Sequence, residues 1–289
     1  MKKILITGTK GYLGTSLKQY LSQWPEYAVT SLSLREDRWE AFDLRGYDAV
    51  YHAAALVHQK KTKDDPACLG EYRKINRDLT LRLAEKAKAA GVGQFLFLST
   101  EAVYGLTAPY GKEIVIGAHT PTAPVDNYGI SKLEAEQGLQ ELASASFRVA
   151  ILRPPLIYGK GCTGNFRALE KMADRLPCFP KIENRRSMLY VENLNALVKL
   201  LIDRQDSGLF CPQDPEPLCT SQVVRAIAQA KGKRLALVPG FGWALGLLGH
   251  VSGSVDKAFG SLRYDEALSR YPQPYQLVSF PESVFRSEI

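Results

Sequence analysis

Metal-binding and disulfide-forming residues are sparse in this sequence of 289 residues. It has five cysteines, and they are scattered at positions 68, 162, 178, 211 and 219. No two of them form a Cys-x-x-Cys pair, and no tight Cys/His cluster has the spacing of a zinc site. An odd, dispersed set of thiols is typical of the reducing cytoplasm rather than of a disulfide scaffold. We therefore predict a cytoplasmic protein without a metal.

Long apolar runs are also missing. The apolar segment at residues 4–6 is far too short for a signal peptide, and Gly8 follows it closely. The most apolar later stretch, residues 235–251, is interrupted by Pro239, four glycines and His250. It falls short of the ~20 apolar residues that a membrane-spanning helix needs. We expect no association with a membrane and interpret this stretch as a docked amphipathic segment.

Neither sign of charge is in large excess. Lys plus Arg number 37 and Asp plus Glu number 30, which gives a net charge of +7. Such a balance is compatible with an anionic ligand, but solubility alone also explains it. No basic stretch is interleaved with aromatic residues, so nucleic-acid binding is not predicted, and the lysines of residues 60–63 indicate a solvated loop. The 45% of hydrophobic residues and 23% of charged residues exclude disorder and fibrous repeats.

Strand-like and helix-like segments alternate through the first half of the chain. The patterns predict strands at residues 3–7, 28–34, 48–53, 94–99 and 147–152, and helices at residues 13–24, 66–90 and 126–143. Such alternation is typical of an α/β fold whose parallel sheet carries helices on both faces. We predict a Rossmann-type, doubly wound sheet with right-handed crossovers.

The composition changes after Arg153-Pro154-Pro155, where prolines and glycines become frequent. Two further helices are predicted at residues 193–203 and 221–230, and the segment 188–202 is expected to return to the sheet. We therefore predict a dinucleotide-binding domain at residues 1–155, to which residues 186–205 return. A smaller, mostly C-terminal substrate-binding lobe would comprise residues 156–185 and 206–289.

Three glycines follow the first predicted strand and open the first helix. Gly8 permits a tight turn, Gly11 allows the backbone to approach a pyrophosphate, and Gly14 allows close packing of helix on strand. The N–H groups and the dipole of the helix terminus then attract the anion. Three glycines alone are a weak signal, but the strand, turn and helix context indicates a dinucleotide site.

A Tyr-x-x-x-Lys pair opens the predicted helix 126–143. Because four residues separate them, Tyr128 and Lys132 lie on one helical face. A phenol with a pKa near 10 is a poor base at neutral pH. A lysine ammonium and the positive nicotinamide ring both favour the phenolate, so the pair is suited to proton transfer beside a nicotinamide.

The glycine spacing, Gly-x-x-Gly-x-x-Gly, resembles the extended short-chain dehydrogenase/reductase family, which contains nucleotide-sugar epimerases and dehydratases. The resemblance covers nearly the whole chain: residues 97–105 are similar to the family's Ser-Ser/Thr-x-x-Val-Tyr-Gly stretch, residues 153–159 to its Arg-Pro-x-x-Val-Tyr-Gly stretch, and residues 184–191 to its Arg-x-x-x-x-Val segment. It implies a catalytic triad of Thr100, Tyr128 and Lys132, in which Thr100 hydrogen-bonds the substrate oxygen.

The resemblance also implies which residues contact the cofactor. Ser33 stands about where an NAD-binding acid would fall, and Arg35 and Arg38 are close by, so NADP is favoured over NAD. Asp43-Leu44 resembles the acid-apolar pair that the family has at the adenine. Ala53-Ala54-Ala55 resembles the small residues that pack on the cofactor. Asn76 resembles the asparagine that supports the active site. The predicted cofactor-binding residues are Gly8, Gly11, Tyr12, Leu13, Gly14, Ser33, Arg35, Asp43, Leu44, Ala53, Ala54, Ala55, Asn76, Ser99 and Pro154.

The substrate implied by the resemblance is a UDP-sugar of bacterial surface-polysaccharide synthesis. Arg186 would grip the nucleotide diphosphate, with Asn165 and Arg263 as further contacts; a surface charge pair is the alternative explanation for Arg185 and Arg186. Dehydratases of the family carry Asp-Glu after the threonine, and Ala102 here occupies the base position, so dehydration is not expected. Hydride and proton transfer at carbon 4 remains, in an epimerase or in a strict NADPH-dependent 4-keto-sugar reductase.

Two further expectations concern assembly and an inactive alternative. The resemblance implies a homodimer whose interface is formed by the helices that begin at Pro66 and Asp126. A non-catalytic dinucleotide sensor that kept the fold is the alternative of a different class, and the complete triad argues against it.

Overall fold

The computed structural model of the chain describes residues 1–35, 37–57, 64–240 and 253–288. The predicted solvated loop at residues 60–63 and most of the predicted amphipathic segment at residues 235–251 lie outside the described residues. The chain divides into two compact units. The first comprises residues 1–105, 121–154 and 195–211, and the second comprises residues 106–120, 155–194 and 212–289. Each unit is described by itself.

A parallel sheet forms the centre of the first unit. Its strands are β1 (Lys2–Thr7), β2 (Tyr27–Leu32), β3 (Ala49–His52), β4 (Gln94–Leu98), β6 (Arg148–Leu152) and β10 (Gly208–Phe210). They lie in the order β10-β6-β4-β3-β1-β2, and every neighbouring pair is parallel. The predicted α/β class is thereby confirmed.

The segment predicted to return to this sheet, residues 188–202, does so only in part. Its strand β9 (Met188–Tyr190) pairs with β7 (Leu156–Tyr158) in the second unit, whereas its residues from 195 onward belong to the first unit. The sixth strand of the sheet is instead β10, which pairs with β6 after helix α6 (Val191–Arg204) has crossed over. A three-residue strand that begins at a glycine carries too little periodicity to be predicted from sequence.

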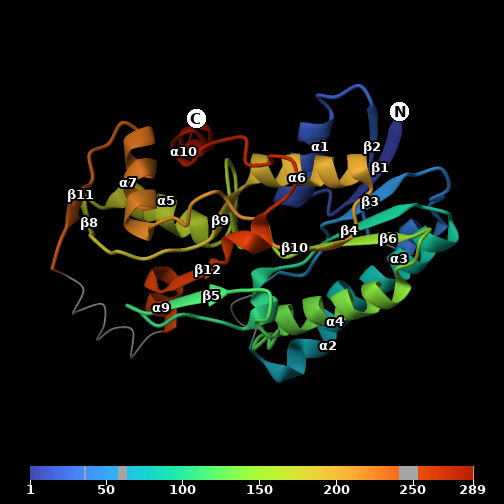
Figure 1. Ribbon diagram of the computed structural model, residues 1–289, viewed down its shortest axis with the longest axis horizontal. Coiled ribbons are helices and arrows are strands. Elements are labelled where there is room, and N and C mark those ends of the chain that lie inside the picture. Colours follow the sequence, from blue (N-terminus) through green and yellow to red (C-terminus); the bar gives the residue numbers. More distant parts are fainter. Residues whose placement is uncertain (36, 58–63, 241–252, 289) are drawn as a thin grey trace. The chain divides into compact units, whose positions relative to one another are not determined.

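Helices cover both faces of the sheet in the first unit (Figure 1). On one face lie α1 (Tyr12–Leu21) and the part of α6 from residue 195, where Asn195 Nδ2 donates to Ser16 Oγ at 2.8 Å. On the other face lie α3 (Leu79–Ala89) and α4 (Asn127–Leu142). Buried apolar side chains from both layers fill the space between the sheet and α3 and α4: Leu5, Val50, Phe95, Phe97, Leu83, Ala84, Ala135 and Leu139.

The helix predicted over residues 66–90 is segmented. A 3₁₀ turn (Pro66–Cys68) leads into α2 (Leu69–Tyr72), a π-helical stretch η3 (Arg73–Asp78) follows, and α3 completes the segment. Long-range hydrogen bonds from Asn76 accompany the π-helical stretch, and such insertions often occur at functional sites. Sequence periodicity does not distinguish a six-residue π-helical stretch from the α-helix around it.

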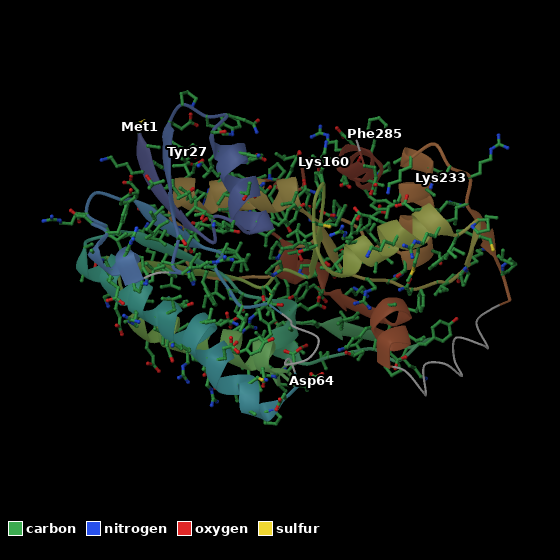
Figure 2. All side chains as sticks on the ribbon, turned by 180° about the vertical axis from the view of Figure 1, so that it is seen from behind. Met1, Tyr27, Asp64, Lys160, Lys233 and Phe285 are labelled. Atoms are coloured by element: carbon green, nitrogen blue, oxygen red, sulfur yellow. The ribbon has the colours of Figure 1, made fainter. Side chains whose placement is uncertain are left out.

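The second unit contains short two-stranded sheets and separate helices. β5 (Glu113–Ile116) pairs with β12 (Ser261–Tyr264), and β8 (Cys178–Pro180) pairs with β11 (Ala236–Val238). Its longer helices are α5 (Asn165–Arg175), α7 (Thr220–Ala230) and α10 (Phe280–Glu288), and α9 spans Gly253–Phe259. Because β5 pairs with β12, residues 106–120 pack with this unit, whereas the expected division kept them in the first. Figure 2 shows Phe285 on α10 and Lys233 beyond α7, and both are exposed.

The amino-terminal edge of the first unit is tied by polar contacts. Figure 2 shows Met1 and Tyr27 near each other at the starts of β1 and β2. Lys2 Nζ forms an ion pair with Asp203 at 3.1 Å, and the hydroxyl of Tyr27 donates to the same carboxylate. Within the described ranges, no helix combines the length and the apolar character that crossing a membrane requires.

Candidate active site

The glycine turn leaves no room for side chains. Gly8 has φ +79°, and a Cβ built there would lie 2.8 Å from Ala53 C and Ala54 N. A Cβ on Gly14 would lie 2.7 Å from Gly8 O. Helix α1 begins at Tyr12. Its N-cap residue is Gly11, so no side-chain cap binds the N–H groups of the first turn. The first-turn N–H groups of a helix have no intrahelical acceptor, so this backbone suits the pyrophosphate of a dinucleotide.

The small residues predicted to contact the cofactor lie against this turn. The same 2.8 Å approach places the backbone of Ala53 and Ala54 beside Gly8, at the carboxyl end of β3. Tyr12, Leu13, Ala53, Ala54 and Ala55 are all partly exposed. Two neighbouring strand ends, β1 and β3, therefore present backbone and small side chains at one edge of the sheet, where doubly wound folds bind ligands.

The residues predicted near the adenosine differ in their surroundings. Ser33 and Arg35 are exposed just after β2, and the Arg35 N–H donates to Ser33 Oγ at 3.5 Å. Arg45 Nη2 donates to Asp43 at 2.8 Å, and this pairing lowers the pKa of Asp43 to about 2. Leu44 is buried in the core cluster of the first unit. Any adenine contact through Asp43 must therefore share its carboxylate with Arg45.

The start of α4 is held against the turn that follows β4. Asp126 caps the helix by accepting the Gly129 N–H at 2.8 Å. A Cβ on Gly129 would lie 2.7 Å from Ala102 O, so only glycine permits this close packing. The contact brings the first turn of α4, which carries Tyr128, beside the segment that carries Thr100.

Thr100 is placed to donate its hydroxyl hydrogen. Its Oγ1 accepts the Ala102 N–H at 3.1 Å, and its backbone is extended, so it caps the short 3₁₀ helix Glu101–Tyr104. The side chain is partly exposed. Because the oxygen serves as an acceptor here, the hydrogen can be donated to another group. The capping role that the sequence left as an alternative is thus compatible with a second role toward a ligand.

Lys132 is buried beneath Tyr128 on the same helix face. Its Nζ lies 5.9 Å from the centroid of the Tyr128 ring and 4.4 Å from that of Phe97. It also donates to Leu98 O at 2.7 Å. Burial lowers the pKa of Lys132 to about 7, and the negative charge of Glu136 opposes this decrease.

The pKa of Tyr128 is raised, first by burial of the phenol and second by the negative Asp126. This differs from the expectation that the neighbouring lysine depresses it. The protein's own groups therefore do not produce a phenolate at neutral pH, and additional positive charge at the site is needed to favour one.

Asn76 joins the loop after β3 to helix α4. Its Oδ1 accepts the Leu56 N–H at 2.7 Å, and its Nδ2 donates to Leu56 O at 3.0 Å and to Ser131 Oγ at 3.0 Å. Ser131 in turn donates to Tyr128 O at 2.9 Å. Asn76 is fully buried, so these bonds are shielded from water. The predicted supporting residue therefore connects the segment that flanks the glycine turn to the backbone of Tyr128.

The sequence patterns did not reveal a buried ion pair between Arg153 and Glu136, which lies on α4 four residues after Lys132. Arg153 Nη2 binds Glu136 at 2.5 Å, and Ser99 donates its hydroxyl to the same carboxylate. Ser99 was predicted to contact the cofactor, but its side chain is buried and directed to Glu136. Pro154 O accepts the Glu101 N–H at 3.0 Å. The spacing of Glu136, four residues after Lys132, was the available signal for its place on this face.

The predicted substrate residues all lie in the second unit. Asn165 is the first residue of α5. Arg186 Nη1 donates to Gly260 O at 3.1 Å, and Arg263 forms an ion pair with Glu113 at 3.0 Å. A cavity of about 690 Å³ in this unit is lined by Arg185 rather than by these arginines. Its other basic lining residues are Lys112, Lys181 and Arg225.

Comparison with known proteins identifies the family of this chain. Residues 4–209 match the sequence profile of the NAD-dependent epimerase/dehydratase family. The chain belongs to this family. It is 31% identical to UDP-glucose 4-epimerase of Vibrio cholerae over 294 aligned residues, which cover 91% of this chain and 87% of that protein. The resemblance inferred from the motifs is therefore confirmed.

Solved structures that contain a nicotinamide dinucleotide have a similar fold. UDP-glucuronic acid 4-epimerase from Bacillus cereus, in complex with NAD, matches with a TM-score of 0.75 and 19% identity, covering 99% of this chain and 97% of that chain. RMD from Pseudomonas aeruginosa, complexed with NADPH, matches with a TM-score of 0.74 and 20% identity, covering 99% and 98%. Among the described residues of this family member, no group of His, Cys, Asp and Glu side chains has the arrangement of a metal site.

Proposed function

We propose that the protein is an NAD(P)-dependent nucleotide-sugar epimerase that acts at carbon 4 of a UDP-sugar. The observation that carries this proposal is the geometry of one end of the first unit's sheet. Thr100, Tyr128 and Lys132 gather where β4 ends and α4 begins, and the glycine turn lies at the ends of β1 and β3 in the same sheet. The similarity to UDP-glucose 4-epimerase of Vibrio cholerae supports the choice of substrate class.

Each residue of the proposed triad has a separate role in the acid–base chemistry. Thr100 donates its hydroxyl hydrogen to the sugar oxygen on carbon 4 and orients it. Tyr128 Oη accepts the proton of that oxygen and later returns it. The Lys132 ammonium, at 5.9 Å from the Tyr128 ring, stabilises the phenolate while the proton is away. The nicotinamide, when bound, supplies the hydride acceptor and donor at carbon 4.

NADP is proposed as the preferred cofactor over NAD. Ser33 offers no carboxylate to hold a ribose 2′-hydroxyl or to repel a 2′-phosphate, and the exposed Arg35 lies two residues away. Similar folds bind either form, NAD in the Bacillus cereus epimerase and NADPH in RMD. Titration calorimetry with NADP⁺ and NAD⁺ tests the preference, and a lower Kd for NAD⁺ contradicts it.

The second unit is proposed to hold the nucleotide part of the substrate. Arg186 and Arg263 are the side chains assigned to the diphosphate, with Asn165 as a further contact. Because Arg186 already binds Gly260 O and Arg263 already binds Glu113, either one must share or exchange its partner to reach a phosphate. Arg186→Ala and Arg263→Ala should therefore raise KM for the nucleotide sugar more than they lower kcat.

A 4-keto-sugar reductase is the second candidate, and the missing acid at position 33 favours it. An epimerase should purify with its dinucleotide retained, whereas a reductase should exchange NADPH freely. Purified protein is incubated with a panel of UDP-sugars and 4-keto derivatives, with each cofactor, and the products are identified by mass and NMR. Tyr128→Phe should abolish turnover while preserving dinucleotide binding. Unchanged turnover in Tyr128→Phe, or no turnover of any compound by the wild type, contradicts the proposal.

A further inference from the structure

Glu136 continues the face of α4 that carries Tyr128 and Lys132. The three residues are spaced by four, so their side chains follow one another along one side of the helix. Glu136 is 2% exposed, and its charge plays no part in the proton transfer proposed above. Burying a charged carboxylate raises the free energy of the folded state unless the charge is paired and hydrogen-bonded.

The partners of Glu136 stand at the ends of the two strands that support the site. Arg153 Nε lies 3.1 Å from both of its carboxylate oxygens, and the Ser99 hydroxyl donates to it. Ser99 immediately precedes Thr100, and Arg153 immediately precedes Pro154. The same guanidinium donates from Nη1 to Tyr104 OH at 3.0 Å. One carboxylate on α4 therefore fixes both strand ends relative to the catalytic helix.

Glu136 is also the opposite charge that acts on Lys132. The groups around Lys132 are His52 on β3, the Phe97 ring and the Leu98 carbonyl on β4, and Tyr128 and Glu136 on its own helix. The guanidinium of Arg153 is bound to Glu136. Burial, and to a lesser extent Lys132, keeps His52 neutral by lowering its pKa to about 3. Among these groups, Glu136 is the one whose charge favours the ammonium form of Lys132.

We propose that Glu136 is a positioning residue of the active site: it ties the strand ends before Thr100 and Pro154 to α4, and it is the counter-charge of the Lys132 ammonium. The proposal rests on the proposed function only for its effect on turnover. The effect on Lys132 itself can be measured without any substrate.

The decisive experiment follows the ionisation of Lys132 by NMR in protein labelled with [¹³Cε]lysine. Lys132→Met assigns the resonance. In Glu136→Gln the pKa of Lys132 should fall by roughly one unit or more, because a nearby opposite charge is removed. The control is Glu134→Gln on the same helix, whose carboxylate pairs with Arg73 at 2.5 Å at the partly exposed surface. This control should leave the titration of Lys132 unchanged.

Turnover provides the second measurement. The alkaline limb of the kcat/KM profile should move to lower pH in Glu136→Gln, so that activity at pH 8 falls roughly tenfold. The profile of Glu134→Gln should match that of the wild type, and Glu136→Asp should recover part of the loss. A decrease that is the same at every pH indicates a merely structural role and overturns the electrostatic part of the proposal.

A double variant separates ionisation from folding. Glu136→Gln alone leaves the buried Arg153 guanidinium without its carboxylate, with Tyr104 as a remaining acceptor, and should lower Tm by roughly 10 °C. Glu136→Gln combined with Arg153→Met removes both charges and should recover most of that loss. The pKa of Lys132 should stay below its wild-type value in the double variant. A wild-type titration of Lys132 in either folded variant overturns the proposal, whether or not any UDP-sugar is turned over.

Discussion

Replacing Gly8 by alanine is expected to damage both the stability of the first unit and its binding of a dinucleotide. Gly8 has φ +79°, a left-handed conformation that costs a residue with a Cβ roughly 1–2 kcal/mol. The new Cβ would also lie 2.8 Å from Ala53 C and Ala54 N. Those atoms are backbone and cannot rotate away, so the ends of β1 and β3 must separate. Overpacking of this kind adds about 1–3 kcal/mol.

The chain offers a matched control in Gly91. Its φ is +80°, almost the same as that of Gly8, but a Cβ there would meet nothing within 4 Å. Gly91→Ala should therefore show only the conformational term, the same roughly 1–2 kcal/mol as at Gly8. The difference between the variants isolates the overlap and should appear as a further decrease in Tm of about 2–4 °C for each kcal/mol.

Binding distinguishes the two variants more sharply than stability. Separation of the strand ends displaces the N–H groups at the start of α1, so Gly8→Ala should weaken dinucleotide binding at least tenfold, about 1.4 kcal/mol. Gly91→Ala should bind as the wild type does. Thermal unfolding and titration calorimetry with NADP⁺ and NAD⁺ measure both effects. Equal Tm values and equal Kd values for the two variants would refute the assignment of the glycine turn as the pyrophosphate site.

Two further predictions concern buried polar groups. Asn76→Ala removes the partner of two backbone groups in the loop after β3. The free energy of unfolding should fall by about 1–3 kcal/mol for each group left unpaired. Denaturant titration measures the loss, and an unchanged midpoint contradicts this account. His52 is buried between two threonine hydroxyls, and burial lowers its pKa to about 3 from the ordinary 6.5. Since the unfolded chain binds the proton first, stability should fall as pH decreases below 6.5, by up to about 1.4 kcal/mol per pH unit. In His52→Gln, the dependence of the unfolding free energy on pH should be flatter between pH 6 and pH 4. The control His119→Gln, at an exposed position, should keep the wild-type slope. Equal slopes in the two variants would contradict the reasoning.

Local features of the fold were predictable because they depend on short-range pattern. The strands β1, β2, β3, β4 and β6 fall within two residues of their predicted positions, as does α4, and α1 ends three residues before its predicted end. Each has a clear local apolar pattern, and α1 is also followed by a stop signal at Pro25. The short strands of the second unit and β10 have only three or four residues, so their pairing depends on partners far along the chain.

The composition of the site divides in the same way. Gly8, Gly14 and the Tyr128–Lys132 pair are recognisable because a tight turn and a helical turn fix neighbours within a few residues. The buried pair of Glu136 and Arg153 is separated by 17 residues, and neither residue type indicates burial by itself. Only the packing of α4 against the ends of β4 and β6 brings these charges together.

The amino-acid sequence by itself determined the parallel α/β architecture, the glycine turn and the helix face that carries Tyr128 and Lys132, since all of these follow from local spacing and backbone sterics. The tertiary structure decided which side chains surround them. It bonds Asn76 to the loop after β3, directs Ser99 to Glu136 rather than outward, and surrounds Lys132 with a protein interior that lowers its pKa to about 7. These outcomes depend on burial and on contacts between distant segments, and both arise only when the chain is folded.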